Sequence, residues 1–210
     1  DRLTTELAEY DALCLLRERT AFPAEVLRGL PNLRALAITG RQNRTLDTDT
    51  AIALGLPVMT TEGSGDGVYA TLELAWGLII GLLRHIPAEA AAMRDGAWQT
   101  RLGSALYGKT IGIVGLGKLG ARMGVVARAF GMNVIAWSPN LTQERAEAAG
   151  ATYADKETLF RTADVISLHL VLGPTTQGII TATDLERMKQ SAILINTARG
   201  EVVDEGALVE

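Results

Sequence analysis

Three glycines with a fixed spacing form the pattern in this sequence that most directly indicates chemistry. The segment Gly115-Leu-Gly117-Lys-Leu-Gly120 follows an apolar stretch at 110–114 and precedes a helical stretch that reaches Phe130. In such a turn the first glycine permits a tight bend, the second lets backbone N–H groups approach a pyrophosphate, and the third lets the helix pack close to the strand. The phosphates then lie at the positive end of a helix. The sequence therefore predicts a dinucleotide site; the alternative is a tight strand-to-helix turn that binds no ligand.

The segments that surround this turn predict a parallel α/β sheet. Further strands are expected at 133–137, 151–153, 164–170 and 192–196, and helices at 142–149, 156–162 and 184–189. Together with the strand before the glycine turn, this order gives five strands of a Rossmann-like sheet. The sixth strand that such a fold usually has would follow Glu210.

The first 60 residues predict a second parallel sheet. Apolar stretches at 12–17, 33–38 and 57–60 alternate with helical segments at 24–30 and 48–54, and this order requires parallel strands. An apolar helix at 68–84 and another from Pro87 to Arg94 are expected to connect the two sheets. Their apolar side chains either pack within the chain or cover the surface of a second subunit. These side chains are Leu74, Leu78, Leu82, Ala90 and Met93.

The composition sets limits on the class of protein. The chain has 210 residues, of which 48% are apolar and 21% charged, enough for one large or two small globular domains. A net charge of −4 without a basic run argues against nucleic acid or a lipid surface as partner. The longest apolar run, near 72–83, is too short to cross a bilayer, and no signal-peptide pattern precedes it. Cys14 is the only cysteine and is expected to be buried in its strand. We therefore expect a cytoplasmic protein.

An arginine follows the last predicted strand. Ligands of open parallel sheets bind outside the carboxyl ends of the strands, and Thr197-Ala-Arg199-Gly200 comes directly after Asn196. A guanidinium at this place can hold a carboxylate with two parallel N–H donors and can polarise an adjacent carbonyl. The alternative is a surface or structural arginine.

Four motifs in order resemble the D-isomer-specific 2-hydroxyacid dehydrogenases. They are the glycine turn, His169-Leu-Val-Leu-Gly-Pro-Thr-Thr-Gln-Gly178, Met188-Lys and Ile195-Asn-Thr-Ala-Arg-Gly-Glu-Val-Val-Asp-Glu205. The segments 61–76 and 16–20 fit the substrate-binding half of the same family. The resemblance implies an α/β fold with a flavodoxin-like substrate-binding domain at 1–84 and a Rossmann-like, doubly wound NAD(P)-binding domain at 85–210, both incomplete. It also implies a cleft between the domains and, as is usual in the family, a homodimer.

The resemblance further implies the roles of individual residues. The pyrophosphate of NAD or NADP would lie on the glycine turn, and two later loops would border the ribose and nicotinamide. Arg199 would be the catalytic residue that holds the carboxylate and oxygen of a small anionic 2-hydroxy or 2-oxo acid. Backbone N–H groups of Ser64 and Gly65 would bind the same carboxylate. The implied cofactor-binding residues are Gly115, Gly117, Lys118, Leu119, Gly120, Ser138, Val171 and Thr197. No metal is implied.

Two further arginines and one substitution leave alternatives open. Arg17 and Arg19, just after the first strand, are either surface charges or the site of a second anionic group on the substrate. Ser138 stands where the family usually has an acidic residue that holds the adenosine ribose. Because serine does not repel a 2′-phosphate, both NAD and NADP are allowed. No arginine follows directly, and Arg145 is the next one along the chain.

Neither histidine of the chain matches the family's acid–base position. Family members exchange the proton through a histidine held by a glutamate, both downstream of the Arg-Gly segment. We therefore expect this chain to be part of a longer enzyme. His85 is expected to be a helix-end cation, and His169 a structural or cofactor-lining residue.

The expected function is hydride transfer between NAD(P) and C2 of a small D-2-hydroxy or 2-oxo acid. The first alternative keeps the fold and takes phosphoglycerate, glyoxylate, hydroxypyruvate or formate as substrate. The second is a dinucleotide sensor without enzymatic activity, as in the transcriptional corepressors of the family.

Overall fold

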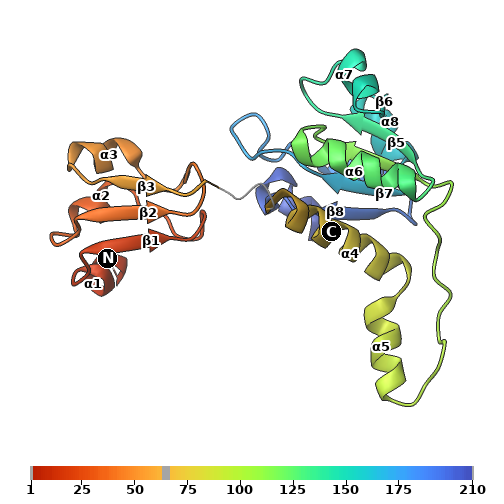
Figure 1. Cartoon of the computed structure of the whole chain (residues 1–210), viewed down its shortest axis with the longest axis horizontal. Helices are drawn as coiled ribbons and strands as arrows, with labels where there is room; N and C mark the ends of the chain where they lie inside the picture. The colour runs from red at the N-terminus through yellow and green to blue at the C-terminus, as the bar shows by residue number, and fades with distance from the viewer. Residues whose placement is uncertain (1, 63–66, 210) are drawn as a thin grey trace. The chain divides into compact units, whose positions relative to one another are not determined.

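A computed structural model describes residues 2–62 and 67–209 and divides the chain into two compact units (Figure 1). The units comprise residues 1–67 and 68–210. The domains expected from the sequence, 1–84 and 85–210, stay a prediction. Each unit has its own parallel sheet and its own buried core, so the predicted α/β class is confirmed.

The first unit is a three-stranded parallel sheet in the order β1-β2-β3. Its core lies where helix α2 and the loops pack on the sheet, around Phe22, Val26, Leu27 and Leu36. The elements are α1 (Arg2–Leu7), β1 (Ala12–Leu15), α2 (Ala24–Arg28), β2 (Ala35–Ile38), α3 (Thr48–Ala53) and β3 (Val58–Thr60). The strands and helices fall where the sequence predicts them, except for α1, which no pattern indicated.

The prediction that Cys14 is buried is wrong. Burial alternates along β1: Leu13 and Leu15 face the core, whereas Ala12 and Cys14 are exposed. Strand β1 is at the edge of its sheet, and Cys14 is exposed on it. An apolar stretch of four residues does not show which of its two faces is covered.

The second unit is a five-stranded parallel sheet in the order β6-β5-β4-β7-β8. Its strands are β4 (Thr110–Val114), β5 (Asn133–Trp137), β6 (Thr152–Tyr153), β7 (Val165–Leu168) and β8 (Ile193–Asn196). Its helices are α4 (Gly67–Leu83), α5 (Ile86–Arg94), α6 (Lys118–Ala129), α7 (Gln143–Ala148), α8 (Lys156–Thr162), α9 (Ala182–Glu186), the 3-10 turn η1 (Gly200–Val202) and α10 (Glu205–Val209). The chain leaves central β4 toward one edge and returns on its other side, which makes the carboxyl end of β4 the switch point where such sheets bind ligands.

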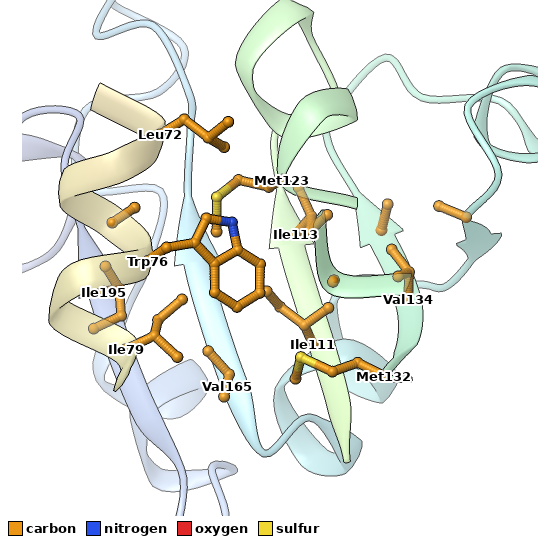
Figure 2. Packing of buried hydrophobic residues seen from close by; sticks show 14 of the residues in the cluster. Leu72, Trp76, Ile79, Ile111, Ile113, Met123, Met132, Val134, Val165 and Ile195 are labelled. Atoms are coloured by element: carbon orange, nitrogen blue, oxygen red, sulfur yellow. The ribbon is translucent and has the colours of Figure 1, made fainter. Parts of the chain in front are cut away.

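Two apolar cores cover the two faces of this sheet. On one face, Trp76 and Ile79 of α4 and Met123 of α6 pack over Ile111 and Val165 (Figure 2). On the other face, Leu159 and Phe160 of α8 lie with Ile166 and Leu168. Helices on both sides leave β4 and β7 almost completely buried, which is why these strands are nearly continuous apolar runs.

Helix α4 has two apolar faces, and the burial of one of them answers part of the open question about the connecting helices. Leu72, Ala75, Trp76 and Ile79 are buried in the core of the second unit. The opposite face remains exposed, with Leu74 57%, Leu78 43% and Leu82 52% accessible. Helix α5 has no buried residue, and it extends away from the sheet together with the segment that follows it (Figure 1). Among the described residues, packing within the chain therefore covers one face of α4 and buries no residue of α5.

Candidate functional site

The glycine turn lies at the carboxyl end of β4. Gly115 has φ 100°, a conformation that side chains rarely tolerate, and its N–H donates to the Trp137 carbonyl over 2.8 Å. A Cβ on Gly115 would come within 2.9 Å of the His169 carbonyl group. Gly115 therefore contacts the ends of both neighbouring strands, β5 through its N–H and β7 through its Cα. No larger residue fits at this position.

The second and third glycines differ in what surrounds them. Gly117 is exposed, and no heavy atom lies within 4 Å of the place where a Cβ would be. A Cβ on buried Gly120 would overlap the Gly115 carbonyl oxygen and lie 3.0 Å from Ile113 Cγ2, so this glycine lets α6 lie close to the sheet. Helix α6 begins at Lys118, so the N–H groups of Lys118 and Leu119 belong to its first turn and have no acceptor within the helix.

Ser138 lies beside this turn, immediately after β5. Trp137 pairs with Val114, so the ends of β4 and β5 are neighbours. The side chain of Ser138 is half-buried, and its carbonyl accepts the Leu141 N–H over 3.1 Å. The structure therefore places the predicted adenosine-side residue next to the glycine turn.

The loop after β7 contributes Val171 and His169. Val171 is 77% exposed, and its carbonyl accepts the Thr176 hydroxyl over 2.7 Å, which fixes the loop. His169 Nε2 lies 2.9 Å from the Oγ of buried Ser167. Burial lowers the pKa of His169 to about 4, so its imidazole is neutral at physiological pH. A neutral, hydrogen-bonded imidazole beneath the turn fits the structural or lining role expected for it.

The loop after β8 holds Thr197 and Arg199. The side chain of Asn196 braces this loop: its Oδ1 accepts the Ala198 N–H over 3.0 Å, and its Nδ2 donates to the Arg199 carbonyl over 2.8 Å. The exposed Arg199 side chain donates from Nη1 to the Ala198 carbonyl over 2.9 Å. The Oγ1 of Thr197 is buried and has no hydrogen-bond partner among the described residues. Asn196 was not identified from the sequence as a residue that shapes this loop. Asn is common in turns because its side chain can accept from the backbone N–H two residues further along, as it does here from Ala198.

These residues fit a dinucleotide. Gly117 leaves an open approach to the N-terminal N–H groups of a helix that is 12 residues long, and such a terminus favours phosphate. The Thr197 hydroxyl is a buried polar group to which no described residue hydrogen-bonds, and such a group ordinarily indicates a ligand or water as its partner. In total, the structure brings the loops after β4, β5, β7 and β8 to one edge of the sheet.

The remaining predicted residues are in or next to the first unit. Ser64 and Gly65 lie outside the described residues. Arg17 has a left-handed backbone, φ 57°, that is held by the Thr39 hydroxyl at its N–H over 3.0 Å and by Asn43 Nδ2 at its carbonyl over 2.8 Å. A strained residue that its neighbours hold in place is often functional. Arg17 and Arg19 both line a groove at the end of β1.

The described residues contain neither a cluster of metal ligands nor a membrane-spanning helix. Among residues 2–62 and 67–209, no group of three or more His, Cys, Asp and Glu side chains could hold a metal ion. In the same residues, no helix combines the length and apolar character that crossing a bilayer requires.

Comparison with known proteins shows the family. Residues 76–210 match the model of the D-isomer specific 2-hydroxyacid dehydrogenase, NAD binding domain. The chain therefore belongs to the D-2-hydroxyacid dehydrogenases, as its motifs predict, and its second unit contains the NAD-binding domain of that family.

Individual relatives are similar over almost the whole chain. A D-3-phosphoglycerate dehydrogenase of Synechocystis is 36% identical over 96% of this chain and 36% of its own length. A hydroxypyruvate reductase of Thermotoga maritima is 34% identical over 100% of this chain and 67% of its own. The crystal structure of a phosphoglycerate oxidoreductase from Vibrio cholerae superposes with a TM-score of 0.91 at 38% identity, over 99% of this chain and 66% of that one. This chain thus spans well under half of the Synechocystis relative.

Proposed function

We propose that this chain is part of an NAD(P)-dependent oxidoreductase that interconverts a small D-2-hydroxy acid and its 2-oxo acid. The observation that carries the proposal is that two loops lie at the same edge of the sheet. One is the glycine turn, which is unobstructed at Gly117, and the other is the loop of Arg199, whose backbone is held by Asn196. Family membership supports it, because the relatives are named for reactions on such acids.

The glycine turn would hold the dinucleotide. The N–H groups of Lys118 and Leu119 would donate to the pyrophosphate, and the buried hydroxyl of Thr197 would hydrogen-bond near the nicotinamide ribose, beside Val171. Ser138 would face the adenosine ribose. When bound, the nicotinamide supplies the hydride acceptor or donor.

Arg199 would orient the acid. Its guanidinium is a permanent cation with planar donors, so it can hold the carboxylate and stabilise negative charge on the C2 oxygen. Asn196 fixes the backbone of Arg199 through the hydrogen bond to its carbonyl, so the side chain starts from a defined position. The role that the family resemblance implies for Ser64 and Gly65, as backbone N–H donors to the same carboxylate, stays a prediction.

A more specific proposal is that the substrate acid carries a second anionic group. It is favoured by Arg17, whose left-handed backbone is held by Thr39 and Asn43 at the carboxyl edge of the first sheet. Phosphoglycerate is such an acid, and two of the similar proteins are named for it. Arg17→Ala should raise KM for the phosphorylated acid much more than for glyoxylate.

We also propose that the protein forms a homodimer through α4 and α5. Leu74, Leu78 and Met93 are exposed on these helices, and an apolar face of this kind is costly to leave in water. Sedimentation equilibrium should show a dimer that Leu78→Glu dissociates. A monomer at micromolar concentration would contradict the proposal.

The cytoplasmic location expected from the sequence stays a prediction.

The reaction is tested with variants of Arg199. Arg199→Ala should lower kcat/KM for 2-oxo acids by about 10²-fold or more, the usual effect of removing a charge-stabilising donor, while the Kd of the dinucleotide stays unchanged. Arg199→Lys should recover part of the loss, and Arg161→Ala, an exposed arginine on α8, should behave as the parent. Unchanged turnover in Arg199→Ala would refute the assigned role. Dinucleotide-dependent binding of a protein partner without any turnover would favour the sensor instead.

A further inference from the structure

The loop after β5 has an unusual charge for a dinucleotide site. In this class of fold, the residue at the end of the second strand meets the adenosine ribose, and an acidic side chain there holds the ribose hydroxyls of NAD. Here the residue is Ser138, and the stretch from Asn133 to Gln143 contains no acidic side chain. The Ser138 hydroxyl has no hydrogen-bond partner among the described residues. It is therefore available as a donor and carries no charge that would repel a phosphate.

A cation is held over the same loop. Arg145, near the start of α7, donates from Nη1 to the Asn140 carbonyl over 2.9 Å. Its backbone N–H donates to the Thr142 hydroxyl over 3.3 Å, which caps the helix. This hydrogen bond folds the guanidinium of the exposed Arg145 back onto the residues that follow Ser138. Because a guanidinium has five N–H donors, the bond to Asn140 leaves donors for a phosphate.

Neighbouring charges do not neutralise this arginine. Among the described residues Arg145 takes part in no ion pair. The carboxylate of Asp155, at the end of the adjacent β6, accepts from the Thr158 N–H over 2.7 Å and from its hydroxyl over 3.0 Å, so it serves as a helix cap. Lys156, whose Nζ lies 5.5 Å from the centroid of the Trp137 ring, is neutralised by its ion pair with Asp184. Arg145 is the cation whose guanidinium contacts this loop.

We propose that this loop selects the cofactor with a 2′-phosphate on its adenosine ribose, so that NADP(H) binds more tightly than NAD(H). Arg145 binds the phosphate through charge-assisted hydrogen bonds, and Ser138 donates its hydroxyl to the same group. The inference rests on the proposed function to the extent that both place a dinucleotide on the glycine turn. It adds which dinucleotide is used and which residues decide it.

Calorimetric titration with NADP+ and NAD+ measures this preference without any need for turnover. The parent protein should bind NADP+ about tenfold more tightly or better, as expected for a charged hydrogen-bonded contact. Arg145→Ala should remove most of that difference by weakening NADP+ alone, and Arg145→Lys should keep part of it. Ser138→Asp should reverse the preference. Arg94→Ala, an exposed arginine in the last turn of α5, is the matched control and should leave both affinities unchanged.

The fragment 2′,5′-ADP provides a second readout, since it carries the 2′-phosphate but no nicotinamide. It should bind more tightly than AMP to the parent and equally to Arg145→Ala. Equal or tighter binding of NAD+ by the parent would overturn the inference and leave the proposed function intact. An equal loss of both cofactors in Arg145→Ala would show a structural role and would also overturn it. If neither dinucleotide binds the parent, the proposed function itself is wrong.

Discussion

Gly117 allows dinucleotide binding to be separated from folding. A Cβ at this position meets no heavy atom within 4 Å, and its backbone, φ −83° and ψ −158°, is one that alanine adopts without strain. Glycine and alanine differ by about 0.5 kcal/mol as helix N-caps. Gly117→Ala should therefore lower the free energy of unfolding only by about this amount. The added methyl group nevertheless stands where a pyrophosphate must approach the first turn of α6.

Gly120 is the matched comparison, because the same change there has a different physical effect. A Cβ on Gly120 would overlap the Gly115 carbonyl oxygen, so α6 would have to move away from β4. Overpacking of this kind costs about 1–3 kcal/mol. Gly120→Ala is therefore expected to lose both stability and binding, whereas Gly117→Ala loses binding alone.

Urea unfolding and calorimetric titration with NADH and NADPH measure the two quantities. For Gly117→Ala we expect a Kd at least about tenfold higher, the effect of about 1.4 kcal/mol, with a nearly unchanged unfolding midpoint. Full affinity for both cofactors in Gly117→Ala would refute the placement of the pyrophosphate on this turn. A large loss of stability in the same variant would refute the argument from open space.

Two further predictions concern the core of the second unit. Burial lowers the pKa of His169 from 6.5 to about 4, so between these values the unfolded chain takes up a proton that the folded state does not; the free energy of unfolding should fall by roughly 3 kcal/mol as pH drops through this window. Urea unfolding at several pH values should show this loss, and His169→Asn should remove it; an identical slope in the variant would assign the loss to other groups. Trp76→Ala should cost about 3–5 kcal/mol and speed amide exchange in α4, whereas Trp76→Phe should cost less, because the Trp76 Nε1 has no partner among the described residues. Unchanged exchange in Trp76→Ala would contradict the packing of α4 on this sheet.

The sequence predicts the buried strands well and the helix ends less well. Strands β4 and β5 have the predicted bounds, because each is a mainly apolar run with turn residues on both sides; β4 is almost fully buried and β5 partly so. Helix α9 was expected at 184–189 but spans Ala182–Glu186. Its start is set by Thr181 and Asp184, whose side chains form a capping box, and by the ion pair of Asp184 with Lys156. That pair joins residues 28 positions apart, which no local pattern reveals.

The same difference holds for the candidate site. The glycine spacing predicts the turn because each glycine is needed for a local reason, either a positive φ or the lack of room for a side chain beside the backbone or the proposed pyrophosphate. The left-handed backbone of Arg17 depends on Thr39 and Asn43, more than 20 residues away, so only its position after a strand could be predicted. The return of Arg145 onto the loop after Ser138 likewise depends on the folded loop. Burial of Cys14 was predicted wrongly because burial depends on what covers a strand.

The central claim is that this chain belongs to an enzyme that transfers hydride between NAD(P) and C2 of a 2-oxo or 2-hydroxy acid. Its most direct test follows oxidation of NADPH and NADH by the full-length protein of which this chain is a part, in the presence of glyoxylate, hydroxypyruvate, pyruvate and 3-phosphohydroxypyruvate in turn. The account predicts oxidation that depends on at least one of these acids, yields the D-hydroxy product and is lost in Arg199→Ala. Tight binding of dinucleotide without oxidation by any 2-oxo acid would contradict it.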